Sequence, residues 1–139
     1  MKYIRIHHST AYTAQEIAAS AHIKGENLAK TVIVKIDGKM AMAVLPAKFK
    51  IDLARLKETT GSSVVELAAE NEFVKVFPEC EAGAMPPFGN LYDMKVYVDK
   101  TLTDAEEISF NAGSHSELIQ LNYKDFENLV RPEIAYFSA

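Results

Sequence analysis

The sequence predicts one domain of mixed α+β class, in which a strongly curved sheet is flanked by helices. Its 139 residues have the length of one domain, and 48% of them are hydrophobic, which is enough to bury a core. Short runs rich in β-branched residues alternate with segments that carry helix-capping signals. An Asp-Gly pair joins two of these runs, as in a tight β-hairpin. No repeat, low-complexity tract or linker interrupts the pattern, so we expect a single domain over residues 1–139.

The first half of the chain is expected to hold a hairpin between two helices. A capping box at Thr13–Glu16 opens a helix that Gly25 can close. Asp37-Gly38 is a turn signal with an apolar run on each side. Leu53 and Leu56 fall on one face of a further helix, with a glycine just past its end. The expected elements are a helix over 13–25, strands over 31–36 and 40–45, and a helix over 52–60.

The second half is expected to begin with a helix and to continue with strands. Ser63–Glu66 is a second capping box, and we expect helical structure from there to about residue 77. A loop rich in Pro and Gly follows over 78–90. A last helix over 123–130 should end at Arg131-Pro132, because the residue before a proline disfavours the α conformation. The remaining expected elements are strands over 94–98, 108–112 and 118–121.

Composition and charge narrow the class of protein. No apolar run reaches the ~20 residues that a membrane helix needs, and the first residues lack the apolar block of a signal peptide. The lone Cys80 cannot form an intramolecular disulfide, which favours a reducing cytoplasm. Residues 1–60 carry ten Lys and Arg against five Asp and Glu, whereas residues 61–139 carry five against fourteen. A phosphate-rich partner would meet the first half if that half forms one face; alternatively, the two halves intermix on the surface.

Several kinds of catalytic site are excluded by the absence of their motifs. The chain has no phosphate-binding Gly-rich loop, no dinucleotide fingerprint and no Gly-x-Ser-x-Gly turn. The histidines at positions 7, 8, 22 and 115 have no zinc-ligand spacing with Cys80. Cys80 is also a poor nucleophile, because Glu79 and Glu81 beside it would raise the pKa of its thiol. We therefore expect a protein without a metal or cofactor.

Three segments carry candidate functional residues, each with a structural alternative. Lys30 shares the face of a predicted strand with Val32 and Val34, so its side chain either snorkels outward or is held inside for a purpose. The stretch from Gly83 to Gly89 contains two prolines, and it is either a rigid ligand-binding loop or an ordinary surface loop. Residues 110–115 place a histidine after a Gly-Ser turn, where it could be a general base, a pocket wall or a surface residue.

Taken in order, these segments resemble the YbaK / prolyl-tRNA synthetase-associated editing domain family. The matching motifs are Ala29–Val32, Ala43–Pro46, Gly83–Pro87 with Phe88-Gly89 after it, and Phe110–Gly113. The resemblance covers nearly the whole chain and leaves no room for a synthetase catalytic core. It implies a mostly antiparallel mixed sheet or barrel flanked by helices. It also implies a free-standing enzyme that hydrolyses the ester joining a wrong amino acid to the 3′ end of a tRNA.

The resemblance also assigns roles to individual residues. Lys30 matches the family lysine that holds the terminal nucleotide and supports catalysis, and Gly83 begins the loop that positions the aminoacyl group. His115 falls at a position that shapes the amino-acid pocket, whose size we expect Met85 to set with it. The expected catalytic residues are Lys30 and Gly83, and the expected substrate-binding residues are Ala84, Met85, Pro86, Pro87, Phe88, Asn111, Gly113 and His115. The candidates for tRNA phosphate contacts are Lys24, Lys48, Lys50, Arg55 and Lys57.

An aminoacyl ester is already activated, so positioning and polarisation suffice for its hydrolysis. Alanine, serine or cysteine on a tRNA for proline or another small amino acid are family-type substrates, and the residues do not choose among them. A synthetase or elongation factor would be a natural partner, and we expect a monomer without membrane contact. Three alternatives stay open: a non-catalytic module that binds tRNA or a synthetase, a hydrolase of small aminoacyl esters, and a Schiff-base lysine enzyme.

Overall fold

The computed structural model describes residues 3–7, 28–73, 75–76, 87, 89, 93–111 and 117–139. The strands in this part of the chain are β1 (Tyr3–His7), β2 (Ala29–Ile36), β3 (Lys39–Pro46), β4 (Val65–Leu67), β5 (Lys95–Asp99), β6 (Glu107–Asn111), β7 (Glu117–Asn122) and β8 (Glu133–Ala135). The helices are α2 (Leu53–Thr60), α3 (Glu70–Phe73), α4 (Tyr123–Val130) and the short 3-10 helix η3 (Lys100–Asp104). The helix expected over 13–25 lies outside the described residues.

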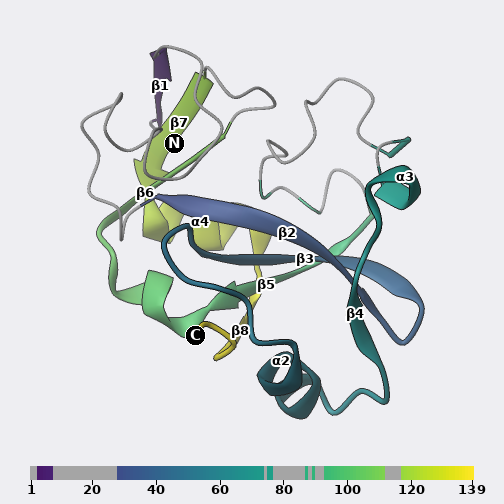
Figure 1. The fold of residues 1–139 in the computed structure, drawn as a ribbon. Helices are drawn as coiled ribbons and strands as arrows, with labels where there is room; N and C mark the ends of the chain where they lie inside the picture. The colour runs from purple at the N-terminus through teal and green to yellow at the C-terminus, as the bar shows by residue number, and fades with distance from the viewer. Residues whose placement is uncertain are drawn as a thin grey trace.

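The strands form two sheets that meet at one point (Figure 1). The larger sheet has the order β4-β2-β3-β5-β8, and the smaller has the order β1-β7-β6. Four of the six pairings between described strands are antiparallel, while β3 with β5 and β5 with β8 are parallel. A parallel bridge from Leu28 to Ser109 joins the start of β2 to β6. The prediction of a mixed α+β fold with a mostly antiparallel sheet is therefore confirmed.

The hairpin between β2 and β3 forms at the predicted Asp-Gly pair. Asp37 has a φ of 50° and Gly38 a φ of 84°, so both turn residues are in the left-handed region that a type I′ turn requires. The register pairs Ile36 with Lys39 and continues without a break to Ala29 with Pro46. This register decides which side chains of β2 and β3 share a face.

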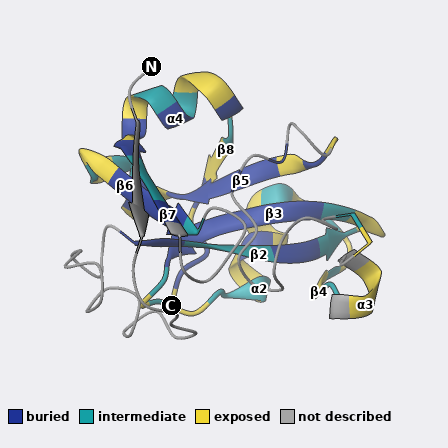
Figure 2. Cartoon of the chain, turned by 90° about the horizontal axis from the view of Figure 1, so that it is seen from above, coloured by how far each residue is buried: buried dark blue, intermediate teal, exposed yellow. Residues whose placement is uncertain are grey.

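Two hydrophobic clusters lie on opposite faces of the larger sheet (Figure 2). The first cluster packs the sheet against β6, β7 and α4, and includes Ile33, Met42 and Phe126. The second packs it against α2 and the segment after β8, and includes Leu56 and Phe137. The helices on the two faces are therefore held by separate apolar contacts. No helix in the described part of the chain is long and apolar enough to cross a membrane.

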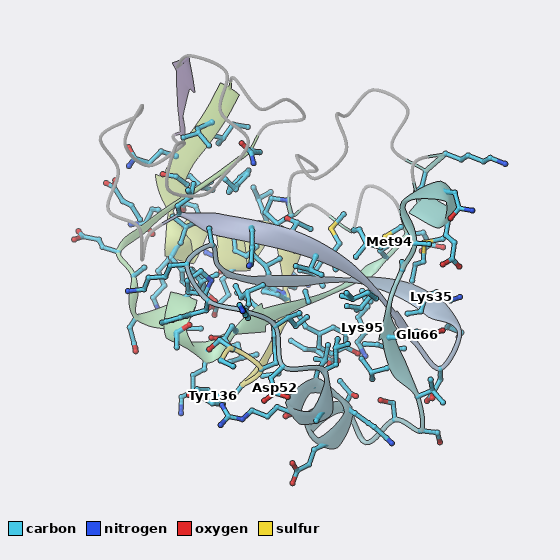
Figure 3. The ribbon with its side chains drawn as sticks, viewed as in Figure 1. Lys35, Asp52, Glu66, Met94, Lys95 and Tyr136 are labelled. Atoms are coloured by element: carbon cyan, nitrogen blue, oxygen red, sulfur yellow. The ribbon has the colours of Figure 1, made fainter. Side chains whose placement is uncertain are left out.

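The predicted helix over residues 63–77 is wrong in its first half. Val65–Leu67 instead forms β4, which pairs antiparallel with residues 34–36 of β2. The Asp37 carboxylate accepts hydrogen bonds from the backbone of Ser63 and Val64, both at 2.9 Å, and so caps this strand from the hairpin turn. If residues 65–67 were helical, the backbone of β2 would have no hydrogen-bonding strand on this side. The β-branched Val64 and Val65 also favour the extended conformation of an edge strand. The salt bridge from Lys35 to Glu66 lies on the same pair of strands (Figure 3).

The helices predicted over 52–60 and 123–130 are confirmed. The Asp52 side chain accepts the backbone N–H of Arg55 at the start of α2, and Gly61 ends the helix with a φ of 66°. Asn122 caps α4 in the same way, and Arg131 ends it in the left-handed conformation. The strands predicted over 31–36, 40–45, 94–98, 108–112 and 118–121 correspond to β2, β3, β5, β6 and β7.

Candidate functional site

Lys30 lies near the start of β2, one face of which carries the second hydrophobic cluster. It pairs across the hairpin with Leu45, whose side chain is fully buried in that cluster. Val32 and Val34 also pack there, so the expected alternation along the strand is present. The Lys30 side chain is half-buried rather than extended into solvent. Lys30 therefore shares a strand face with apolar residues that are buried in the second hydrophobic cluster.

The surroundings of Lys30 disfavour its positive charge. Burial lowers the pKa of Lys30, and the nearby ammonium of Lys50 lowers it further. Within the described part of the chain, neither a hydrogen bond nor an ion pair to a carboxylate is found for Lys30. An anionic ligand at this point would relieve both effects, because its charge would offset the repulsion between the two ammonium groups. These properties suit a lysine that holds a phosphate or a developing negative charge.

Asn111 lies on the neighbouring strand, on the same side of the sheet junction as Lys30. The parallel bridge pairs Leu28 with Ser109, and Lys30 and Asn111 each follow that bridge by two residues. Because side chains alternate with a period of two, both point to the side opposite the first hydrophobic cluster, which contains Ala29 and Phe110. Two of the segments singled out in the sequence are 29–32 and 110–113. The structure brings the start of the first close to the described part of the second, residues 110 and 111 (Figure 1).

Buried polar atoms without a partner gather around this junction. The Asn111 Oδ1, Ser109 Oγ and Thr31 Oγ1 atoms are all buried and have no hydrogen-bond partner among the described residues. An unsatisfied buried polar atom costs about 1–3 kcal/mol, so native folds carry few of them. Thr31 shares the face of Ala29 and Ile33 in the first hydrophobic cluster, whereas Ser109 and Asn111 lie on the side of Lys30. The atoms of Ser109 and Asn111 are therefore candidates for contact with a ligand beside Lys30. Thr31 and Ser109 were not among the candidate site residues from the sequence. A hydroxyl residue within an otherwise apolar strand could have indicated them as candidates.

The Gly-x-x-x-Pro loop is described only at its end. Pro87 and Gly89 are buried, whereas Gly83, Ala84, Met85, Pro86 and Phe88 lie outside the described residues. A Cβ on Gly89 would lie 2.6 Å from Val96 Cγ2 and 2.8 Å from the Met94 carbonyl oxygen, so only glycine fits. Gly89 therefore packs on the first hydrophobic cluster, on the face of β2 and β3 opposite to the Lys30 side chain. Contact of Lys30 with residues 83–86 stays a prediction, and Gly113 and His115 also lie outside the described part.

The candidate phosphate-binding residues differ in their surroundings. Lys50 is exposed and lies close enough to Lys30 to affect its pKa, and the Lys48 ammonium lies 5.1 Å from the centre of the Phe49 ring. Arg55 donates from Nη1 to the Ser138 carbonyl at 3.1 Å. Lys57 is exposed on α2, roughly 200° around the helix from Arg55. Lys24 lies outside the described residues.

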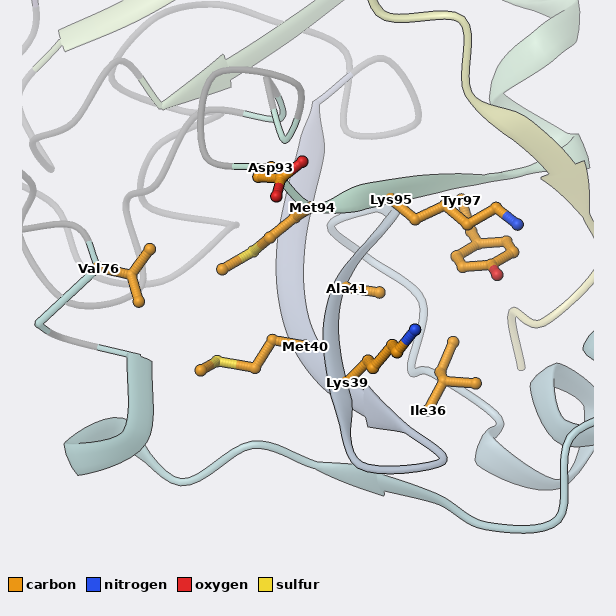
Figure 4. Close-up of a pocket in the computed structure, with 9 residues that line it drawn as sticks. All are labelled: Ile36, Lys39, Met40, Ala41, Val76, Asp93, Met94, Lys95 and Tyr97. Carbon is orange, nitrogen blue, oxygen red and sulfur yellow. The ribbon is translucent and has the colours of Figure 1, made fainter.

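A cavity of about 690 Å³ lies at the other end of the hairpin from Lys30 (Figure 4). Met40, Met94 and Val76 form its apolar side, and the Lys95 ammonium at its rim is bound to Glu133 at 2.8 Å. The other described lining residues are Ile36, Lys39, Ala41, Asp93 and Tyr97. Lys30, Pro87 and Asn111, which are the predicted site residues that the structure describes, do not line this cavity. Among the described residues, no group of three His, Cys, Asp or Glu side chains could hold a metal ion.

The fold and the site define the class of protein: a small α+β domain with a half-buried lysine at the junction of two sheets, for which the described residues supply no carboxylate partner. The profile of the aminoacyl-tRNA editing domain matches residues 8–129. The chain therefore belongs to the aminoacyl-tRNA editing domain family, and the resemblance seen in the sequence is confirmed.

Relatives and solved structures agree with this assignment. Over 85 residues the chain is 31% identical to a proline–tRNA ligase of Bacillus cereus (strain AH187) and 29% identical to that of Bacillus mycoides (strain KBAB4). These matches cover 61% of this chain but only 15% of each ligase. The hypothetical protein APE2540 superposes with a TM-score of 0.88 at 21% identity, covering all of this chain and 93% of that one. A protein proposed as a trans-editing enzyme for prolyl tRNA synthetase gives 0.87 at 17% identity, covering 99% and 87%.

Proposed function

We propose that this chain is a trans-editing aminoacyl-tRNA deacylase, which hydrolyses the ester of a mischarged tRNA. The proposal rests on the membership in the editing-domain family together with the half-buried Lys30, whose charge lacks a described partner. The match spans only a small part of the ligases, so activity apart from a synthetase core is part of the proposal. Its setting would be the cytoplasm, where tRNAs are charged, and a synthetase or elongation factor would be its partner.

The proposed substrates carry a small amino acid, namely alanine, serine or cysteine. The two ligases matched over 85 residues act on proline, which makes tRNA-Pro the first tRNA to examine. A closed apolar pocket can reject a larger side chain by steric clash, whereas it discriminates a missing methylene by only about 10–200-fold. We assign the pocket to Met85 and His115, with Ala84, Pro86, Pro87, Phe88 and Gly113 completing the substrate contacts.

The proposed reaction needs neither a metal nor a covalent intermediate. Water attacks the ester carbonyl carbon, the bond from that carbon to the ribose oxygen breaks, and the departing oxygen takes up a proton. Lys30 would hold the terminal nucleotide, and the backbone at Gly83 would orient the aminoacyl group and stabilise the oxyanion. The unpartnered Oδ1 of Asn111 is an acceptor suited to the ammonium of the aminoacyl group. The vicinal hydroxyl of the terminal ribose would help to activate the water.

A deacylation assay over a panel of mischarged tRNAs tests the proposal. We expect hydrolysis of at least one tRNA that carries alanine, serine or cysteine, with a rate that falls ~10²–10³-fold in Lys30→Ala. Lys39→Ala is the matched control, because Lys39 is exposed at the other end of the hairpin. Equal rates in Lys30→Ala and the wild type would remove Lys30 from the mechanism.

The same assay separates the enzyme from a non-catalytic module of the same fold. A module would bind tRNA or a synthetase and would leave every ester intact. Hydrolysis of free aminoacyl esters at the same rate as aminoacyl-tRNA would instead indicate a small-molecule hydrolase. Either result would contradict a trans-editing function.

A further inference from the structure

An aromatic residue with a cation stacked on it lies on the surface, close in sequence to the bridge between Ile51 and Ser138. The Arg55 guanidinium lies 4.8 Å from the centre of the Tyr136 ring, and 49% of the Tyr136 surface is exposed. Arg55 is held in place from two sides, because Nη1 donates to the Ser138 carbonyl at 3.1 Å and Nε lies 3.5 Å from the Asp52 carboxylate. The pair is therefore pre-organised, with the guanidinium over one face of the ring. Figure 3 shows Tyr136 and Asp52 beside α2.

The backbone connects this pair to the Lys30 region. Ile51 and Ser138 form an antiparallel bridge, and Lys50 exchanges two backbone hydrogen bonds with Ala139. Tyr136 is three residues from Ala139, or roughly 10 Å along an extended chain. Lys50 in turn lies close enough to Lys30 to repel its charge. Lys50 is therefore linked to Lys30 by the proximity of their charges and to the segment that carries Tyr136 by backbone hydrogen bonds. Lys30, Lys50 and the Arg55–Tyr136 pair, taken in that order, define the path considered for a ligand.

The chemistry along this path suits a single strand of RNA. Lys30 and Lys50 are cations without a carboxylate partner among the described residues, while the Asp52 carboxylate is occupied by Arg55 and by the cap of α2. Cations spaced along a path bind phosphates, and an exposed aromatic ring provides a face on which a base can stack.

We infer that Tyr136, stacked on Arg55, is a platform for an unpaired base near the 3′ end of the bound tRNA, with Lys50 contacting the phosphate between that base and the nucleotide at Lys30. This inference rests on the proposed function for the identity of its ligand. It assigns a role to Tyr136, which no motif in the sequence indicated. It also gives Arg55 a different role from Lys57: Arg55 is part of the stacking surface, whereas Lys57 lies on the other side of α2.

The test is direct binding of an uncharged tRNA-Pro transcript, compared with the same transcript trimmed of its single-stranded 3′ end. Tyr136→Ala should weaken binding of the full transcript about tenfold and leave binding of the trimmed one unchanged. Tyr136→Phe keeps the ring and should bind as the wild type does. Ile134→Ala is the matched control, because Ile134 is 51% exposed on β8 but carries no ring.

The salt dependence of binding separates stacking from charge. Lys50→Ala should lower the slope of log affinity against log salt concentration by about one, whereas Tyr136→Ala should leave that slope unchanged. Wild-type affinity of Tyr136→Ala for the full transcript would overturn the inference, even if the protein deacylates tRNA. A self-association that Tyr136→Ala abolishes, with tRNA binding unaltered, would also overturn it and assign the surface to a protein contact. Binding that depends on Tyr136 in a protein without deacylase activity would uphold the surface and contradict the enzyme.

Discussion

The carboxylate of Asp99 accepts a hydrogen bond of 2.8 Å from the backbone amide of Phe137, although 38 residues separate the two in sequence. The same oxygen accepts the amide of Ser138 at 3.0 Å, and the other oxygen accepts the backbone and side-chain donors of Thr101. Asp99 is fully buried, so these donors replace the water that the carboxylate has lost. The contact fixes the segment that carries Tyr136 against the end of β5.

Replacing Asp99 should therefore destabilise the whole domain. Asp99→Ala leaves the amides of Phe137 and Ser138 buried without an acceptor, and we expect the free energy of unfolding to fall by about 2–4 kcal/mol. Urea denaturation measures this loss. Asp104→Ala, at an exposed position of η3, is the control and should stay within about 0.5 kcal/mol of the wild type. A similarly small effect of Asp99→Ala would show that the buried carboxylate is dispensable.

Gly89→Ala should destabilise the protein through steric overlap. The new Cβ would lie 2.6 Å from a Val96 methyl carbon and 2.8 Å from the Met94 carbonyl oxygen, and the backbone oxygen cannot move aside easily. We expect a loss of about 1–3 kcal/mol in thermal or urea unfolding. Gly38→Asn is the control, because the turn glycine has open space around it and asparagine tolerates a positive φ. An unchanged midpoint in Gly89→Ala would contradict the close packing of this segment.

The lowered pKa of Lys30 predicts a pH-dependent stability. The unfolded chain binds the proton of Lys30 more tightly than the folded chain, so the charged side chain costs stability below its folded pKa. That cost is relieved as the pH rises from the folded pKa toward the ordinary lysine value of 10.5. Lys30→Met should consequently be more stable than the wild type at neutral pH, and the difference should shrink as the pH approaches that value. A difference that does not vary with pH would mean that the Lys30 ammonium is freely solvated.

Asn111→Ala should separate activity from stability. Its Oδ1 is buried without a partner, so its removal breaks no hydrogen bond made by that atom, and the free energy of unfolding should change by less than about 1 kcal/mol. Deacylation should nevertheless fall by at least about tenfold if this atom binds the aminoacyl group. Ser109→Ala, which removes another unpartnered buried oxygen, is the comparison for stability. A stable Asn111→Ala variant with wild-type kcat/KM would exclude Asn111 from the substrate site.

His115→Ala should change which amino acid is removed more than how fast. We expect its ratio of kcat/KM values for alanyl-, seryl- and cysteinyl-tRNA to shift, because the residue is proposed to shape the pocket rather than to act on the ester. The measurement is the initial rate of deacylation for each charged tRNA, with Lys30→Ala as the reference for lost chemistry. Identical ratios in His115→Ala and the wild type would place His115 outside the pocket.

Local sequence signals predicted those elements whose residues interact with near neighbours. The Asp37-Gly38 turn, the glycine after α2 and the end of α4 at Arg131 each depend on a few neighbouring residues, and each appears in the structure. The helix expected from the Ser63–Glu66 capping box is wrong because these residues interact with a distant part of the chain. Their hydrogen-bonding partners come from β2, about 30 residues earlier, and a capping signal cannot register that competition.

The motifs of the sequence were sufficient to determine the family and the class of fold, because those motifs are properties of short segments read in order, whereas the role of Lys30 stays a prediction. Only the tertiary structure decided that Lys30 and Asn111 flank one strand junction and that the segments carrying Lys50 and Tyr136 are joined by backbone hydrogen bonds. These relationships depend on which strands pair and in which register, and that choice is made by the burial of whole faces rather than by any local pattern. The physical reason is that register and burial are collective properties of the folded chain.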